Sequence, residues 1–219
     1  MVNRKRDFDL EATTWDEKPH RVTLANDLFT AIAGTVALTP SLEVFDFGCG
    51  TGLLTLQLAA QAGHVTGADS SRTMLDVLAR KAKDCQIGNI TTYHIDAACV
   101  DAIEGRYDLV TSTMTLHHVR DIAPLLEQFF RILRPGGHVC IADLDLENGD
   151  FHGNNEDVFH FGFDRGLLQE TLSAAGFVRV RNKKATEVHK TGSDGQVRSF
   201  SVFLITGQRR EACITTGGT

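Results

Sequence analysis

The sequence predicts an α/β protein with a doubly wound, mostly parallel sheet. Residues 44–47 form a short apolar run, glycines follow at alternate positions, and a helix-forming segment, 53–59, begins at once. Strand-like runs recur at 64–69, 89–97, 107–113 and 133–143. Between the second and third runs, apolar residues are spaced by three and four, which is typical of a helix. Strands that alternate with helices in this way indicate a parallel sheet with helical crossovers.

The glycines Gly48, Gly50 and Gly52 form the most informative motif. Glycine lets the backbone turn sharply and lets a ligand approach the main chain, and nucleotide-like ligands bind at such strand–loop–helix junctions. The dinucleotide fingerprint has its third glycine one residue later. Asp46 would also lie beside a pyrophosphate, at a cost on the order of several kcal/mol. A ligand with a cationic amino acid end is therefore favoured.

The chain resembles the class I S-adenosylmethionine-dependent methyltransferases, and the resemblance covers residues 42–145. Five segments match in order: the glycine loop, the strand ending at Asp69, the strand ending in Asp96-Ala97, the strand ending at Thr113 with Leu116-His117-His118-Val119 after it, and residues 133–143. The resemblance implies a seven-stranded sheet in the order 3-2-1-4-5-7-6 with the last strand antiparallel. A hairpin of 177–186 and 199–206 fits that closing pair.

S-adenosyl-L-methionine is the cofactor that this resemblance implies. Asp69 is expected to accept hydrogen bonds from the ribose hydroxyls, and Asp96-Ala97 to hold the adenine. Core packing is the simpler interpretation of Met74, which lies on an apolar helical face. The full set of candidate cofactor-binding residues is Asp46, Gly48, Cys49, Gly50, Gly52, Asp69, Ser70, Met74, Asp96, Ala97 and Thr113.

Three histidines are candidate general bases or acceptor-positioning residues, because histidine titrates near neutrality. His117 follows the fourth strand, whereas His152 and His160 lie on the irregular segment 146–163. The alternative is that one or more of them only orients a loop. His152, Asp157 and His160 could bind a metal by residue type, but their spacing matches no known signature, and we predict no metal.

The same segment carries phenylalanines that could line an acceptor pocket. They are Phe151, Phe159, Phe161 and Phe163. An aromatic wall suits a small, partly apolar metabolite, although these side chains could equally pack the loop onto the sheet.

We divide the chain into an N-terminal helical cover, 1–38, a Rossmann-like methyltransferase domain, 39–210, and a flexible tail, 211–219. Two helices are expected in the cover, near 10–18 and from Pro19 onward. In similar enzymes such a segment lies over the cofactor. Trp15 and Arg21 are the candidate cofactor contacts of this segment. The alternative is that Trp15 is an ordinary packing residue and Arg21 is a surface charge.

Composition narrows the function further. The 219 residues carry a net charge of −6, which disfavours a nucleic acid partner. The sequence has no membrane-spanning apolar run. Its five cysteines form no C-x-x-C pair, which indicates free thiols and a cytoplasmic location.

We therefore predict methyl transfer to a small-molecule acceptor. No Asn/Asp-Pro-Pro-aromatic tetrad or Pro-Cys pair is present, which argues against the adenine-amine and cytosine-C5 enzymes. The accepting atom (O, N, S or C) and the oligomeric state stay open. Two alternatives remain, namely a non-catalytic S-adenosylmethionine-binding module and, less favoured, a nicotinamide-dependent oxidoreductase.

Overall fold

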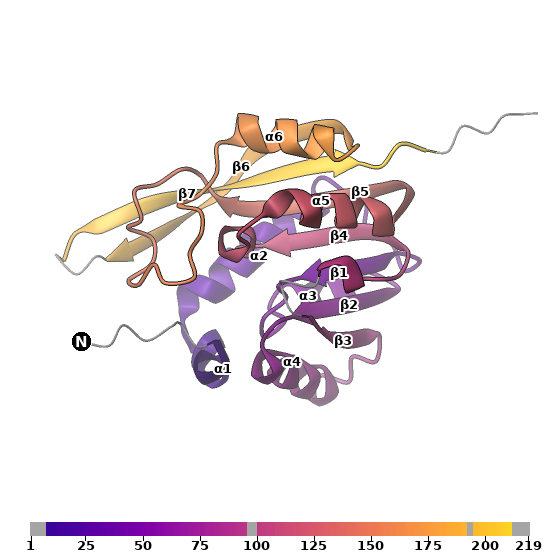
Figure 1. The fold of residues 1–219 in the computed structure, drawn as a ribbon. Coiled ribbons are helices and arrows are strands. Elements are labelled where there is room, and N and C mark those ends of the chain that lie inside the picture. Colours follow the sequence, from indigo (N-terminus) through magenta and orange to yellow (C-terminus); the bar gives the residue numbers. More distant parts are fainter. Residues whose placement is uncertain (1–7, 96–99, 192–194, 212–219) are drawn as a thin grey trace, which may run out of the picture.

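The computed structural model describes residues 8–95, 100–191 and 195–211. Over these residues the chain forms one seven-stranded sheet in the order β3-β2-β1-β4-β5-β7-β6 (Figure 1). Pairing is parallel from β3 to β5, and β7 is antiparallel to both neighbours. The predicted fold class and strand order are therefore confirmed. The strands are β1 (Glu43–Phe47), β2 (His64–Asp69), β3 (Ile90–His94), β4 (Tyr107–Thr113), β5 (Leu133–Leu144), β6 (Val178–Thr191) and β7 (Val197–Gln208).

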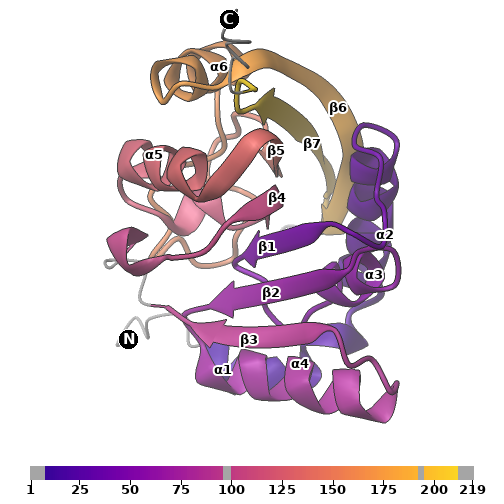
Figure 2. The ribbon, with the colours of Figure 1, turned by 90° about the vertical axis from the view of Figure 1, so that its right-hand side faces the viewer.

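Helices cover both faces of the sheet (Figure 2). One face carries α2 (Pro19–Ala33) and α3 (Thr55–Ala59), and the other carries α5 (Ile122–Ile132) and α6 (Arg165–Ala174). Helix α4 (Arg72–Asp84) packs on β2 and β3, and α1 (Phe8–Glu11) packs on α4. Three 3-10 turns complete the described elements: η1 (Ala12–Glu17), η2 (Val100–Ala102) and η3 (Leu116–His118).

The alternation of side chains along β1 places Asp46 inside the protein. Phe45 and Phe47 pack in the core beneath α5 and α6, whereas Val44 packs in the core beneath α2 and α3. Because successive strand residues point to opposite faces, Asp46 shares the face of Val44. Its side chain is accordingly buried between the sheet and α3.

The last hairpin is longer than the sequence predicted. β6 extends to Thr191 and β7 begins at Val197, whereas the sequence predicted an end at 186 and a start at 199. β6 is an edge strand, where exposed charged residues such as Glu187 are tolerated. The pair Val188↔Phe200 is buried and holds the extension together.

Some predictions fall on residues that the structure does not describe. Asp96 and Ala97, the pair predicted to hold the adenine, lie outside the described residues, as does the predicted tail beyond Glu211. Within the described ranges, no helix combines the length and apolar character needed to cross a bilayer.

Candidate active site

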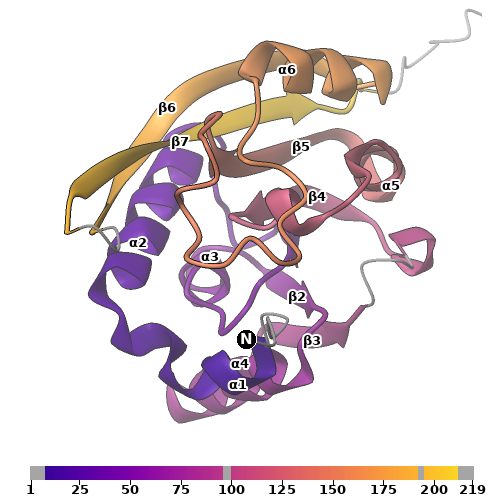
Figure 3. The same ribbon diagram turned by 60° about the vertical axis from the view of Figure 1, so that its left-hand side comes forward.

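A cavity of about 2190 Å³ opens where the parallel strands end. The loop between β5 and α6, the helices α1 and α2, and the far end of the β6–β7 hairpin gather on that side of the molecule (Figure 3). Single-ligand pockets measure roughly 300–1,000 Å³. The cavity therefore has room for two ligands side by side.

The three glycines of the loop have left-handed φ angles of 73°, 54° and 81°, but they meet different surroundings. A Cβ on Gly48 would lie 2.2 Å from Thr115 Oγ1, and one on Gly52 would lie 2.2 Å from Leu78 Cδ1. A Cβ on Gly50 would meet no described atom within 4 Å, and Gly50 lines the cavity. Gly48 and Gly52 are thus required by packing, whereas Gly50 keeps ligand space open.

Asp46 is buried at the base of this loop, with 1% of its surface exposed. Thr55 of α3 donates a hydrogen bond to one carboxylate oxygen and Thr111 of β4 donates to the other, each at 2.7 Å. Burial raises the pKa of Asp46 to about 6, although the two hydroxyl bonds act in the opposite direction. Asp46 also lines the cavity, so a cation entering there would meet a carboxylate that can readily ionise.

Asp69, at the end of β2, connects the glycine loop to α4. Its carboxylate accepts hydrogen bonds from Gly50 N at 2.8 Å and from Ser71 N at 2.9 Å. Burial raises the pKa of Asp69, while these backbone donors oppose the shift. The backbone N–H of Ser70 also stabilises this carboxylate. An ionised carboxylate has about four acceptor positions, so at least one remains for a ligand in the cavity, which Asp69 lines.

The other candidate cofactor residues that the structure describes also border the cavity. They are Cys49, Ser70, Met74 and Thr113. Burial raises the pKa of Cys49 well above its usual value, so its thiol stays neutral. Met74 is almost fully buried against Ala12, Val77 and the partly buried Trp15, which agrees with a mainly structural role.

Two aspartates of the N-terminal helices hydrogen-bond to the glycine loop and to α4. Asp9 accepts hydrogen bonds from the Ser71 hydroxyl and from Thr73 N at the start of α4. Asp16 accepts from Thr51 Oγ1 at 2.6 Å and pairs with Lys81 at 2.6 Å. The N-terminal helices thus contact the glycine loop and α4, both of which border the cavity.

Trp15 and Arg21 line the cavity together. The Arg21 guanidinium lies 3.4 Å from the centre of the Trp15 ring and pairs with Glu11 at 2.9 Å. This stacked pair presents an aromatic and cationic surface to the cavity.

His117 is held by a partner that the sequence analysis did not identify. Its Nδ1 lies 2.7 Å from Oδ1 of Asp143, at the end of β5, and both side chains are buried. A carboxylate accepts, so Nδ1 donates, and in the neutral imidazole the proton-free nitrogen is then Nε2. The sequence does show Asp143 as an acid at the end of a predicted strand. Recognising it as the partner of His117 required the β4–β5 register, in which Thr113 pairs with Ala142.

His118 and His152 join His117 at the cavity wall, whereas His160 lies apart. The ring centre of His117 is 4.2 Å from that of His118 and 5.0 Å from that of His152. His118 Nδ1 bonds the carbonyl of Asp157 at 2.8 Å. His160 Nε2 bonds the carbonyl of Val119 at 2.9 Å, and among the described cavity-lining residues His160 does not occur.

Only part of the predicted phenylalanine wall faces the cavity. Phe151 and Phe159 line it, as do Val188 and Lys190 of the hairpin extension and Phe200 of β7. Phe163 instead packs in the core, because its backbone pairs with β5 at the bridge Asp145↔Phe163. Phe161 is 42% exposed. The hairpin's contribution was missed, since the extension itself was not predicted.

Comparison with known proteins identifies the family. Residues 44–137 match a family described as "Methyltransferase domain". A demethylmenaquinone methyltransferase of Clavibacter sepedonicus is 30% identical over 208 residues, covering 82% of this chain and 84% of that protein. An uncharacterized methyltransferase of Schizosaccharomyces pombe is 29% identical over 121 residues, covering 52% of this chain and only 42% of that protein.

Solved structures share the fold. A SAM-dependent methyltransferase from Aquifex aeolicus superposes with a TM-score of 0.67 at 18% identity, covering 93% of this chain and 99% of that one. The sheet order, the glycine loop with Asp46 and Asp69, and the near full-length Clavibacter relative all indicate the same family. The chain belongs to the class I S-adenosylmethionine-dependent methyltransferases, and S-adenosylmethionine is its cofactor.

Proposed function

We propose that this protein transfers a methyl group to a hydroxylated aromatic small molecule, with His117 accepting the proton that the hydroxyl releases. The observation that carries the proposal is the buried His117–Asp143 pair, which opens onto the same cavity as the glycine loop. The Clavibacter relative is named for a quinone acceptor, demethylmenaquinone. Such an acceptor is aromatic and, in its quinol form, carries acidic hydroxyls.

The residues on the cofactor side fit S-adenosylmethionine. Gly50 leaves room for a ligand against the main chain, while Asp46 brings a buried carboxylate and Asp69 a partly buried one to the cavity. When bound, the cofactor supplies a methyl group that is activated by its positively charged sulfur. The chain's own task is to align the acceptor and exclude water, which can contribute several kcal/mol by proximity alone.

The acceptor side combines a base with aromatic and cationic groups. Asp143 holds His117 in the tautomer that leaves Nε2 able to take a proton. Such a positioned base contributes roughly 10²–10⁴-fold to a proton-transfer step. Phe151 and Phe159 offer ring contacts, and Lys190 lies 3.5 Å from the centre of the Phe151 ring. These contacts favour a planar acceptor with partial negative charge.

The direct test uses a panel of phenols, catechols and hydroquinones, with primary amines and thiols as comparison compounds. Each is incubated with the protein and S-adenosylmethionine, and formation of S-adenosylhomocysteine and methylated product is followed by mass spectrometry. We expect turnover with hydroxylated aromatics. Turnover confined to amines or thiols would contradict the role of His117. Cofactor binding without transfer to any compound would favour the non-catalytic module.

Asp69→Ala is expected to weaken cofactor binding by about 1.5–3 kcal/mol, the range for hydrogen bonds to a charged group. Because Asp69 also holds Gly50 N, affinity alone does not separate ribose contact from loop support. Calorimetry should therefore compare S-adenosylhomocysteine with its 2′-deoxy analogue. If Asp69 binds the ribose, removing the hydroxyl weakens binding to the wild type more than to the variant. An equal loss in both proteins would limit Asp69 to supporting the loop.

Cofactor binding is expected to release a proton near pH 6. The free carboxyl of Asp46 has a pKa of about 6, and a cationic ligand beside it favours the ionised form, which lowers that pKa in the complex. Affinity should therefore rise as the pH increases toward 6 and level off above it. Calorimetry at pH 6 in buffers of different ionisation enthalpy measures the released proton. Asp46→Asn should remove it, and equal proton release in both proteins would assign it elsewhere.

We also propose that residues 1–38 act as a movable cover over the cofactor and that the protein works in the cytoplasm. Support for the cover comes from the contacts of Asp9 and Asp16 with α4 and the glycine loop. Support for the location comes from Cys49, Cys85 and Cys140, which are free thiols, as is typical of a reducing compartment.

A further inference from the structure

We propose that His117, His118 and His152 form a binding site for a divalent transition metal ion such as Zn²⁺. One ligand nitrogen from each residue can be chosen so that all three lie within 4.8 Å of one another. The residues come from two separate segments, the turn after β4 and the loop after β5, which the fold brings together at the cavity wall. The sequence predicted no metal, because the only set considered was His152, Asp157 and His160, whose spacing matches no known signature. That set did not bring His152 together with His117 and His118.

In two of the three imidazoles one ring nitrogen donates a hydrogen bond to a protein oxygen, as is usual for metal-binding histidines. His117 donates from Nδ1 to Asp143, and His118 donates from Nδ1 to the carbonyl of Asp157. A carbonyl or carboxylate oxygen only accepts, so in the neutral form of each ring the proton is on Nδ1 and Nε2 is the nitrogen that can bind a metal. Metal-ligating histidines almost always donate their other ring N–H to a carboxylate or a backbone carbonyl, which fixes the tautomer and raises the basicity of the ligand.

Backbone strain occurs at both segments that carry the cluster. Met114 and Asp157 have left-handed φ angles of 54° and 61°, although neither is glycine. Met114 precedes the turn with His117 and His118, and Asp157 supplies the carbonyl that holds His118. Such conformations cost roughly 1–3 kcal/mol each and collect at functional sites. Here the strain lies where it sets the positions of the imidazoles.

The donor set selects the kind of ion. Three neutral imidazoles suit Zn²⁺, Co²⁺, Ni²⁺ or Cu²⁺, whereas Mg²⁺ and Ca²⁺ require oxygen ligands. In a tetrahedral zinc site with Zn–N near 2.0–2.1 Å, ligand nitrogens are about 3.4 Å apart. The cluster therefore needs to contract slightly around the ion. His152 lies on a loop, which can accommodate such a shift.

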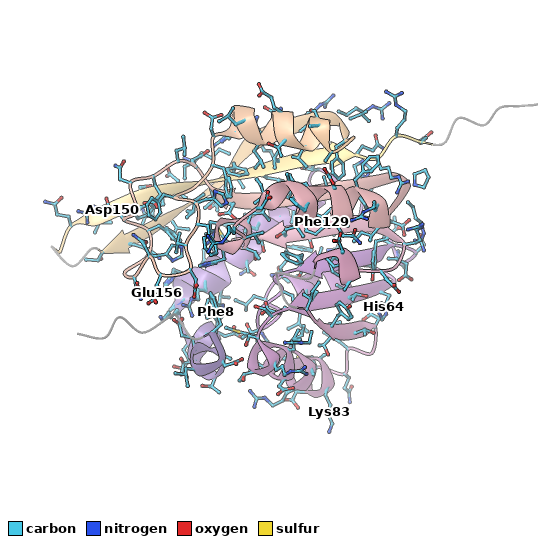
Figure 4. The ribbon with its side chains drawn as sticks, viewed as in Figure 1. Phe8, His64, Lys83, Phe129, Asp150 and Glu156 are labelled. Carbon is cyan, nitrogen blue, oxygen red and sulfur yellow. The ribbon has the colours of Figure 1, made fainter. Side chains whose placement is uncertain are left out.

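The fourth coordination position would face the cavity, as in catalytic zinc sites with three protein ligands. The cover reaches this point as well, since the Phe8 ring packs edge-on against His118, with ring centres 5.3 Å apart. Figure 4 labels Phe8, which lies in α1, and Glu156, which lies in the loop between β5 and α6. An acceptor oxygen of the proposed class would fit the open position, and this part of the inference rests on the proposed function.

The ion and the proposed base use the same lone pair. A metal bound to His117 Nε2 prevents that nitrogen from taking a proton, so the loaded site would bind the acceptor oxygen directly and His117 would act as a ligand. Metal binding itself depends on neither cofactor nor acceptor. It can therefore be tested on the chain alone.

The experiment titrates untagged, metal-free protein with Co²⁺ and Zn²⁺ in the absence of other ligands. We expect one Co²⁺ per chain with the intense visible absorption of tetrahedral coordination, displacement of Co²⁺ by Zn²⁺, and no competition from Mg²⁺. His152→Ala should weaken Co²⁺ binding at least about 10-fold, and Asp143→Asn should weaken it about 10–100-fold, as for other partners behind a ligand. Thermal unfolding verifies that each variant folds.

The matched control is His64→Ala, which removes a histidine at the start of β2, far from Phe8 and Glu156 in Figure 4. Its Co²⁺ binding should equal that of the wild type. An octahedral spectrum, or His152→Ala binding as tightly as His64→Ala, would overturn the site. Neither result decides whether the protein transfers methyl groups, and each would leave His117 in the role of proposed base instead of metal ligand. Conversely, a protein that binds Co²⁺ in this way but methylates no acceptor would refute only the proposed function.

Discussion

Replacing Gly50 with valine is expected to abolish S-adenosylmethionine binding while leaving the protein folded. A side chain on Gly50 would point into open space on the cavity side of the loop. In the free protein it therefore costs only the strain of a left-handed residue, roughly 1–2 kcal/mol for alanine and more for valine. In the complex it would occupy the space through which the cofactor approaches the main chain.

The effect should grow with the size of the side chain. Gly50→Ala places one methyl group in a close contact, which typically costs roughly 1–3 kcal/mol, or about 5–150-fold in the dissociation constant. Valine adds two further carbons and should bring binding below detection. Calorimetry gives the affinities, and thermal unfolding gives the stability of each variant.

Gly195 provides the matched control. It too has a left-handed φ, 77°, and a Cβ at this position would meet no described atom within 4 Å, but Gly195 lies in the turn of the β6–β7 hairpin. Gly195→Ala and Gly195→Val should lose similar stability and bind the cofactor normally. If the Gly50 variants bind as tightly as the Gly195 variants, the glycine loop does not contact the cofactor.

The alternation of strands and helices and the glycine loop could be predicted because local patterns determine them, whereas the strand order followed from the resemblance to the methyltransferase family. The apolar run before Asp46 and the alternate glycines are readable within nine residues of sequence. The residues that end strands β2 and β4, Asp69 and Thr113, were also placed at the cavity. Parallel strands bring their carboxyl ends to one edge of the sheet, so these positions follow once the strands are recognised.

The contacts between distant segments could not be predicted in the same way. Asp143 meets His117 because of the β4–β5 register, and His152 meets both His117 and His118 because of the path of a loop. Similarly, Asp16 reaches Thr51 across 35 positions of sequence. Neither the periodicity of a sequence nor its residue types determine the register between two strands or the path of a loop. These contacts therefore required the three-dimensional structure.

Asp143→Asn is expected to lower kcat by about 10²–10⁴-fold, the contribution of a positioned general base, on an acceptor that the wild type methylates. The carboxylate fixes the His117 tautomer with the proton on Nδ1. An asparagine can instead present its N–H₂ group to Nδ1, which favours the tautomer protonated at Nε2 and removes the lone pair that faces the cavity. Affinity for S-adenosylmethionine should be unchanged.

Asp145→Asn is the control, since Asp145 lies two residues further along, pairs with Arg165, and is absent from the described cavity lining. Its kcat should stay near the wild-type value.

A double-mutant cycle then separates positioning from general destabilisation. If Asp143 acts only through His117, then Asp143→Asn, His117→Gln and the double variant should all lose a similar factor in kcat, because residues that act as a unit are strongly non-additive. Multiplicative losses would show that the two residues act independently, and a fall in cofactor affinity that matches the fall in rate would show that the substitutions damage the fold. Unchanged kcat in both single variants would remove the pair from the reaction.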